Sequence, residues 1–424
     1  MSKSAPNQTY IYLHKVDGDA NNNKFYEMKN MGDGTFISTY GREGAEKPQK
    51  KSYPMSDWDS VYSEKTGSRK GYTDVTQFKS EQKVIPNPSA TNSKSQVISA
   101  DPKVVSLITA LQKHANVATA ASYKVEAKQV TQAQIDEAQK QVDLLANSVK
   151  KYFGTPQWDT DKFNKALTYL MIIIPRKMKH VADHLVSKTI TRNELDKLID
   201  NEQALLDSMA GQVIQNTATD ATTTTSSIAA QQTLLEQLGL EIRPATPAEF
   251  AEAKANARDH GHKIANVFKV VNKTTQQVFN NDLAKSANKK TMTLWHGSRR
   301  QNWFFIINQG LKIRPSGAIH TGSMFGDGIY FASEDDKSMG YTEGGRWTYG
   351  SSKGSESVFM ALYDVRVGKQ YETHHSDSSL CFSKVQRNGN CDSTWGKKGP
   401  SLHRHEYIIY RSEQSTIKYL VEFK

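Results

Sequence analysis

Apolar and polar residues near the N-terminus alternate with the two-residue period of β-strands. Aromatic and branched side chains gather in runs at residues 10–13, 25–28 and 35–40. Turn-forming residues separate these runs, so the pattern predicts a small antiparallel β-domain within residues 1–85. Pro86 and Pro88 then begin a polar stretch, which predicts a linker over residues 86–98.

Beyond this linker the apolar positions recur about every three or four residues, as on one face of a helix. Asp101 can cap a helix that begins at Pro102, and Thr131 with Gln134 forms a capping box for another helix. The pattern therefore predicts an all-α helical bundle over residues 99–216. Its core is expected to include Val104, Leu107, Ile108, Leu111, Ile135, Ala138, Val142, Leu145 and Val149.

The last part of the chain returns to strand-like runs after a stretch rich in Thr and Ser. That stretch, residues 217–227, is of low complexity and predicts a flexible linker. Strands are expected at residues 264–271, 358–365 and 417–421. Because helical patterns lie between these runs, we predict an α+β domain over residues 228–424. The chain as a whole is thus expected to be multidomain.

Length and hydropathy agree with that division. The chain has 424 residues, of which 37% are hydrophobic, enough for several cores. No apolar run reaches the roughly 18 residues of a membrane span, and no apolar signal-peptide core follows Met1. We therefore expect a soluble intracellular protein without a membrane partner. It would act in the nucleus of a eukaryote, or in the cytoplasm and nucleoid of a bacterium.

The cysteines argue against disulfides and metals. Cys381 and Cys391 are too few for a disulfide framework. They share a region with His374 and His375, but they lack the Cys-x-x-Cys spacing of zinc sites. We expect two reduced cysteines in a loop and no metal.

Charge suggests a partner. The net charge of +11 would suit a polyanion, because Lys and Arg neutralise phosphates and release counterions. A solubilising basic surface is the alternative, and charge alone does not decide between them.

Short motifs in the last domain carry candidate chemistry. His296 and Gly297 end a predicted strand, Tyr330 lies in a Gly-x-Gly-Ile-Tyr-Phe run, and Glu406 lies in a Glu-Tyr-Ile-Ile-Tyr run. Each has an ordinary structural reading. The His could be a turn residue, the Tyr a core residue, and the Glu the exposed position of an alternating strand.

Taken in order, the His, the Tyr and the Glu resemble the catalytic triad of the poly(ADP-ribose) polymerases. Residues 228–424 resemble that family's catalytic ADP-ribosyltransferase domain. The resemblance implies that NAD is the substrate, that no cofactor is held permanently, and that ADP-ribose is transferred while nicotinamide leaves. The catalytic residues it implies are His296, Tyr330 and Glu406.

The resemblance also implies NAD contacts. His296 would hold an adenosine-ribose hydroxyl and help to orient nicotinamide, and Glu406 would permit chain elongation. The remaining residues are expected to bind the carboxamide, flank the ring or approach the adenosine, and they are Gly297, Ser298, Lys312, Tyr330, Ser338 and Tyr341. Ser323 and Phe305 depart from the family's usual residues. Residues 374–400 are expected to be a surface insertion.

The first two domains resemble parts of the same family. Residues 99–216 are similar to its helical regulatory domain, which blocks NAD until DNA binds. Residues 8–80 resemble a WGR domain that includes a helix, with Tyr40 in place of the name-giving Trp. Tyr40 would stack on a DNA end, Arg69 and Lys70 would bind phosphate, and Arg42 would relay the signal between domains.

The leading interpretation is thus a polymerase that is activated by DNA strand breaks. Its partners would be broken DNA, NAD and acceptor proteins, including the protein itself. Two alternatives stay open. One is a mono-ADP-ribosyltransferase with the same fold, and the other is a DNA-end-binding scaffold whose transferase domain is silent.

Overall fold

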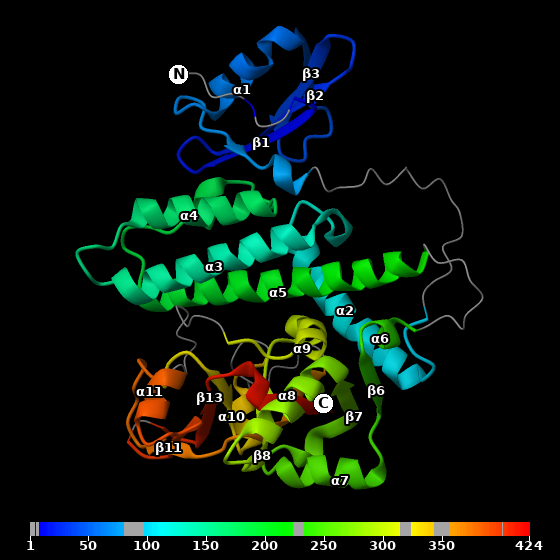
Figure 1. Cartoon of the computed structure of the whole chain (residues 1–424), viewed down its shortest axis with the longest axis vertical. Helices are drawn as coiled ribbons and strands as arrows, with labels where there is room; N and C mark the ends of the chain where they lie inside the picture. The colour runs from blue at the N-terminus through cyan, green and yellow to red at the C-terminus, as the bar shows by residue number, and fades with distance from the viewer. Residues whose placement is uncertain are drawn as a thin grey trace. The chain divides into compact units, whose positions relative to one another are not determined.

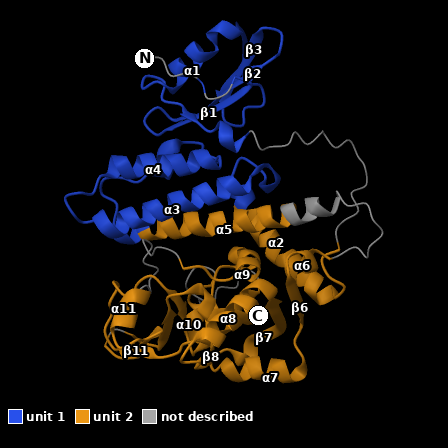
Figure 2. Ribbon diagram, in the orientation of Figure 1, with its two compact units in different colours: residues 1–93, 119–195 blue, residues 94–118, 196–424 orange. Residues whose placement is uncertain are grey.

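The computed structural model describes residues 5, 8–79, 97–223, 233–313, 324–342, 357–400 and 402–424, and of residues 217–223 only the backbone. Ser323 and residues 86–96 of the expected linker lie outside this described part. Contacts divide the chain into two compact units (Figure 2). Unit 1 comprises Met1–Ser93 and Thr119–Leu195, and unit 2 comprises Lys94–Ala118 and Asp196–Lys424.

The N-terminal residues of unit 1 form the predicted antiparallel sheet. Its strands follow the order β4-β3-β2-β1-β5. They are β1 (Tyr10–Asp17), β2 (Asn22–Asn30), β3 (Thr35–Arg42), β4 (Gln49–Pro54) and β5 (Thr73–Asp74). Helix α1 (Trp58–Thr66) supplies Trp58 and Val61 to the buried cluster that contains Ile11, Met28 and Phe36. The three predicted strands are confirmed, and β4 and β5 extend the sheet.

The helices of unit 1 begin where their capping residues lie. Helix α3 (Gln132–Tyr152) starts with the capping box of Thr131 and Gln134, as predicted. Helix α4 (Thr160–Ile173) lies beside it (Figure 1). The Nε2 group of Gln134 donates a 2.7 Å hydrogen bond to the carbonyl of Ile173, so the cap also joins the two helices. The predicted core positions of α3 are buried.

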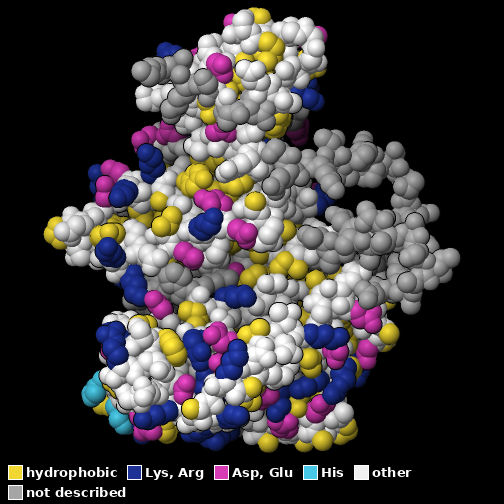
Figure 3. All heavy atoms as spheres, viewed as in Figure 1, with side chains coloured by type: hydrophobic (Ala, Val, Ile, Leu, Met, Phe, Trp, Pro, Cys, Tyr) yellow, Lys and Arg dark blue, Asp and Glu magenta, His cyan; other side chains and the backbone are white. Residues whose placement is uncertain are grey.

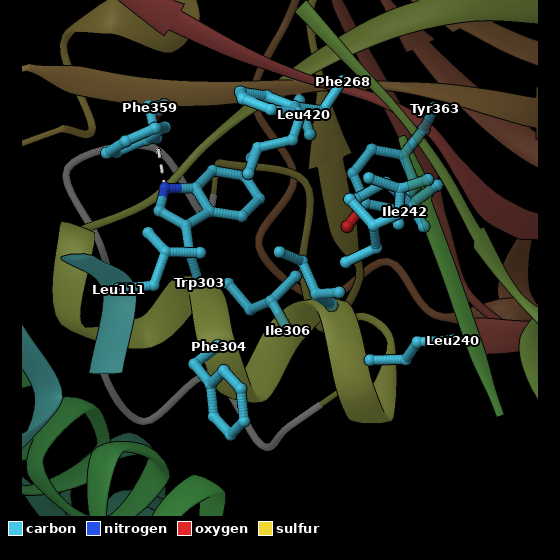
Figure 4. Packing of buried hydrophobic residues seen from close by; sticks show 14 of the residues in the cluster. Leu111, Leu240, Ile242, Phe268, Trp303, Phe304, Ile306, Phe359, Tyr363 and Leu420 are labelled. Atoms are coloured by element: carbon cyan, nitrogen blue, oxygen red, sulfur yellow. Dashed lines mark hydrogen bonds between the residues drawn. The ribbon is translucent and has the colours of Figure 1, made fainter. Parts of the chain in front are cut away.

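Two long helices belong to both units. Helix α2 (Pro102–Ser122) starts at the predicted cap, where the Asp101 carboxylate accepts the backbone N–H of Lys103 at 2.8 Å. Its apolar face joins the buried cluster of unit 2, where Leu111 lies beside Trp303 (Figure 4). Helix α5 (Arg192–Thr223) continues past residue 216, where we expected a linker to begin.

Unit 2 contains the predicted α+β fold, built on two sheets. The first has the order β6-β7-β14-β10-β8 and the second the order β11-β12-β13-β9. Their strands are β6 (Leu240–Pro244), β7 (Ile264–Asn272), β8 (Thr291–Gly297), β9 (Ile329–Phe331), β10 (Val358–Arg366), β11 (Gln370–Thr373), β12 (Ser393–Gly396), β13 (Glu406–Ile409) and β14 (Ser415–Phe423). The strands predicted at residues 264–271, 358–365 and 417–421 are confirmed as β7, β10 and β14, and the strand predicted to end at His296 and Gly297 is confirmed as β8.

Short helices cover these sheets. They are α6 (Leu234–Gln237), α7 (Pro247–Asn256), α8 (Lys273–Lys285), α9 (Trp303–Gln309), α10 (Asp335–Met339) and α11 (Phe382–Arg387). Trp303 of α9 is buried, and its Nε1 donates a 3.1 Å hydrogen bond to the carbonyl of Phe359 (Figure 4). Helix α9 is thereby fixed to β10, which is the neighbour of β8 in the sheet.

Within the described residues, none of the helices combines the length and the apolar character that crossing a membrane requires.

Candidate active site

His296 lies near the end of β8, in a setting made of aromatic rings. Its ring centroid is 6.5 Å from that of Trp303, 5.8 Å from Phe331 and 6.1 Å from Tyr363. Its Nδ1 is 3.0 Å from the carbonyl oxygen of Tyr330. Because a carbonyl can only accept, this contact favours the tautomer that carries its proton on Nδ1. The hydrogen bond and the aromatic neighbours therefore fix the His296 side chain. His296 lies in strand β8, so it is not an ordinary turn residue.

Gly297 is a position that only glycine can fill. A Cβ atom built there would lie 1.9 Å from the carbonyl oxygen of Ser338, far inside van der Waals contact. The backbone of β8 and the helix α10 therefore meet directly at these two residues. A β-bridge joins Trp295 of β8 to Ala332, which lies just after β9 in the segment that leads into α10. The structure thus brings Gly297 and Ser338 side by side, and their expected contacts with a carboxamide stay a prediction.

The two tyrosines are partly buried and neutral. The hydroxyl of Tyr330 donates to the carbonyl of Gly326 at 2.8 Å and accepts from the backbone N–H of Phe325 at 3.0 Å. Burial raises the pKa of Tyr330 and also that of Tyr341. Both rings therefore stay uncharged across the physiological range, as suits side chains that would contact a flat ring.

Glu406 is buried at the first position of β13. Only 1% of the residue is exposed, so its reading as the exposed position of an alternating strand is wrong. Its Oε1 is 2.5 Å from the Nζ of Lys337, and its Oε2 has no hydrogen-bond partner among the described residues. Burial raises the pKa of Glu406, and the Lys337 ammonium opposes that rise. The site holds a desolvated carboxylate with one oxygen still available.

Lys337 is the residue that sequence reasoning missed. It precedes Ser338 on α10, and its Nζ lies 6.0 Å from the ring centre of Tyr341 as well as against Glu406. The sequence held one weak signal, a lysine inside a segment already singled out for Ser338 and Tyr341. Nothing in the spacing indicated that this lysine would meet a glutamate about seventy positions later in the chain.

Two further residues that are expected to contact NAD, Ser298 and Lys312, lie on either side of α9. Ser298 precedes that helix, and its hydroxyl accepts from the side-chain amide of Asn302 at 3.3 Å. Lys312 follows it. Their contacts with NAD stay predictions. Among the described residues, no group of three or more His, Cys, Asp or Glu side chains could hold a metal ion.

The residues predicted to meet DNA lie in unit 1. Tyr40 of β3 stacks on Tyr26 at 5.4 Å between ring centroids and 19° between planes. Arg69 is 82% exposed, with its Nη2 3.8 Å from Glu64, and it lies beside Lys70 just after α1. These positions are compatible with phosphate contacts, which stay a prediction.

Arg42 joins the sheet of unit 1 to its helices. The Nη2 of this side chain donates to the carbonyls of Met178 at 3.1 Å and Lys179 at 3.0 Å, and the Nη1 donates to Asn21 at 2.9 Å. The residue expected to relay between domains therefore bridges the strand that carries Tyr40 to the segment after α4.

Charge is not gathered into one patch on the visible face of unit 2. In Figure 3, Lys and Arg side chains are spread there among Asp and Glu side chains. The net charge of +11 consequently gives no location for a polyanion on that face.

Comparisons with known proteins identify relatives of both regions. The family model of the poly(ADP-ribose) polymerase catalytic domain matches residues 248–403, and the WGR domain model matches residues 9–79. A putative poly [ADP-ribose] polymerase-like protein of Invertebrate iridescent virus 6 is 34% identical over 152 residues, which is 34% of this chain and 78% of the viral protein.

Longer relatives align over a smaller share of their length. Poly [ADP-ribose] polymerase 2 of Arabidopsis thaliana is 33% identical over 33% of this chain and 25% of its own. Poly [ADP-ribose] polymerase 2 of Homo sapiens is 28% identical over 39% of this chain and 31% of its own. The chain therefore spans about a quarter to a third of these two relatives.

Proposed function

Because the chain belongs to the poly(ADP-ribose) polymerase family, we propose that residues 228–424 transfer ADP-ribose from NAD to acceptor proteins and extend it into chains. The observation that carries the proposal is the buried carboxylate of Glu406, which keeps one oxygen unpaired and meets Lys337 through the other.

The residues divide the reaction between them. Backbone groups of Gly297 and the hydroxyl of Ser338 hold the carboxamide of nicotinamide, and the rings of Tyr330 and Tyr341 flank its plane. The bond between the ribose carbon and nicotinamide breaks, and nicotinamide leaves with the bonding electron pair. The carbon becomes cationic, and a carboxylate in a shielded site stabilises that charge better than water would.

Glu406 has a second task in the acceptor step. The unpaired Oε2 accepts a hydrogen bond from a hydroxyl of the ribose or of the acceptor, which makes the acceptor oxygen a better nucleophile. That oxygen forms the new bond to the ribose carbon, and its proton passes to Glu406 or to solvent. The Lys337 ammonium favours the ionised form of this carboxylate, because it opposes the effect of burial on the pKa of Glu406.

We further propose that DNA with strand breaks activates this reaction through the WGR domain at residues 1–85 and the regulatory helices at residues 99–216. The match to the WGR model and the Arg42 contacts with residues 178 and 179 support this proposal. A location with DNA follows, in the nucleus of a eukaryote or in the nucleoid of a bacterium.

Contacts of α5 support an inhibited resting state. Arg299 lies only two positions after Gly297, and its Nη1 donates a 2.8 Å hydrogen bond to the side-chain oxygen of Asn201 in α5. A Cβ at Gly211 would lie 3.3 Å from the ring of Phe304, so helix and ring are closely packed. A helix seated there restricts access to the segment that would hold NAD, and DNA would shift the equilibrium towards an open state.

The test is incubation of the full chain with labelled NAD, with and without nicked DNA. A ladder of products that appears with DNA supports the polymerase. A single labelled band would instead indicate mono-ADP-ribosylation. An absence of label together with DNA binding would indicate a scaffold and overturn the proposed activity.

A further inference from the structure

Arg404 joins the strand that carries Glu406 to the helix that carries Lys337. It lies two positions before Glu406, in the connection between β12 and β13. Its Nε is 2.8 Å from Glu334, and its Nη2 is 2.7 Å from Asp336. These two carboxylates flank the first residue of α10, and Lys337 follows Asp336 directly.

The connection that presents Arg404 is itself held in place. The backbone N–H of Gly399 donates to Leu402 at 2.9 Å, and Leu402 is buried. The indole N–H of Trp395 donates to the Nδ1 of His405 at 3.1 Å. These contacts restrain the backbone that carries Arg404. The Arg404 side chain can therefore fix the position of α10 relative to that backbone.

A second set of contacts holds the first residue of α10. The buried carboxylate of Asp335 accepts the backbone N–H groups of Asp259 at 3.1 Å and His260 at 2.7 Å. It also lies 3.0 Å from the Nδ1 of His260. The start of α10 thus contacts both the segment after α7 and the segment before β13.

Stability does not account for Arg404. Its side chain is 38% exposed, and exposed ion pairs contribute little to stability because water and salt screen them. Geometry gives a better account, since the planar guanidinium fixes the direction of both carboxylates at once. Three links connect β13, which carries Glu406, to α10, which carries Lys337. They are the pairing of β13 with β9, the short connection from β9 to α10, and the contacts of Arg404.

We propose that Arg404 is a positioning residue that holds α10 against β13, so that the ammonium of Lys337 stays on the carboxylate of Glu406. The proposal rests on the proposed ADP-ribosyl transfer. It assigns Arg404 no contact with NAD, because none of its contacts reaches His296, Gly297 or Ser338 in the described residues.

Loss of Arg404 should affect turnover more than NAD binding. Misplacement of a catalytic group by about 1 Å can cost on the order of a hundredfold in rate. We therefore expect Arg404→Gln to lower kcat between about tenfold and about a hundredfold, with a change in the KM for NAD of less than about threefold. Arg404→Lys keeps the charge but not the planar fork, so it should recover part of kcat.

The acid side of the pH–rate profile gives a second readout. The groups that face Glu406 are Lys337 of α10, Tyr341 just after it, and Tyr330 of β9. If Lys337 withdraws, burial raises the pKa of Glu406 without opposition. The variant should then lose activity at a higher pH than the wild type, because its carboxylate is protonated earlier.

Lys397→Gln is the matched control. Lys397 lies in the same connection, and its ammonium pairs with Glu372 rather than with α10. The experiment compares thermal unfolding, kcat, KM and the pH profile of the full chain and the three variants, with nicked DNA. Arg404→Gln should unfold within about 2 °C of the control, as an exposed ion pair implies, while its kcat falls and its acid limb shifts.

Two outcomes would overturn the positioning role: equal kinetics for Arg404→Gln and Lys397→Gln, or a lowered kcat with an unshifted acid limb. An inactive wild-type chain would refute the proposed function instead, so the two failures are distinguishable.

Discussion

At the scale of single residues, the proposed reaction depends most on Glu406. We expect Glu406→Gln to lower polymer formation by about 10²–10³, because the amide keeps the shape but cannot stabilise a cation. Benzamide binding should persist, since we propose that Gly297 and Ser338, and not Glu406, bind the carboxamide. Gel analysis with labelled NAD measures the first effect, and calorimetric titration with benzamide measures the second. Long chains made at the wild-type rate would contradict this role.

The burial of His14 leads us to expect that unit 1 loses stability in acid. It is fully buried, with its Nε2 2.8 Å from Asn23 and 3.7 Å from Glu43. Burial lowers the pKa of His14, against the partial opposition of Glu43. The unfolded chain therefore binds this proton more readily than the folded one. The stability of the fold that contains neutral His14 is fully present above the ordinary histidine pKa, and it is lost as the pH falls below that value.

We expect the unfolding temperature to fall between about pH 8 and about pH 5.5, and His14→Gln to reduce that fall. His184→Gln, at an exposed histidine of the same unit, is the control and should leave the pH dependence unchanged. Thermal unfolding followed by circular dichroism provides the measurement. Equal pH dependence in all three proteins would exclude His14 as the source.

At the scale of elements, sequence patterns predicted what local chemistry determines. The caps at Asp101 and Thr131 begin helices as expected, because each side chain satisfies backbone N–H groups within its own turn. Strands β7, β10 and β14 were predicted from their apolar runs. The short helix α10 was not, since five residues carry too little periodicity.

The candidate site was predictable only in part. Motif resemblance indicated His296, Gly297, Tyr330 and Glu406. The pairing of Glu406 with Lys337 depends on how β13 aligns with β9, and that register is set by tertiary packing. The same limit applies to Arg404, whose partners lie about seventy positions earlier in the sequence.

Helix α5 offers a test of the resting state. We expect Gly211→Val to push α5 away from α9, because even a Cβ there lies 3.3 Å from the ring of Phe304. Activity without DNA should rise several-fold, while the DNA-stimulated rate changes little. Lys197→Val, which introduces the same side chain at an exposed position of α5, is the control. Unchanged basal activity in a folded Gly211→Val protein would argue against inhibition by α5.

At the scale of the whole molecule, the division into units changes how the regulatory helices can be removed. Val104, Leu107, Ile108 and Leu111 of α2 belong to the buried cluster around Trp303. Deletion of residues 99–216 should therefore lower the unfolding temperature, since each lost Leu or Ile contact resembles a core truncation of about 2–5 kcal/mol.

Deletion of residues 119–195, with a flexible linker in their place, should leave a folded unit 2. Differential scanning fluorimetry of the two shortened chains with benzamide compares them directly. If the protein without residues 99–216 unfolds at the same temperature as the protein without residues 119–195, then α2 does not stabilise this core.

The unpaired oxygen of Glu406 also has a meaning for inhibitor design. A benzamide-like compound that fills the nicotinamide position could extend an N–H or O–H group towards this buried acceptor. The bond would form in a desolvated setting, where a charge-assisted hydrogen bond contributes more than in water. A methyl ether at the same place would leave the carboxylate unsatisfied and should bind less tightly. The difference in affinity between these two compounds would show how far an inhibitor can exploit this oxygen of Glu406.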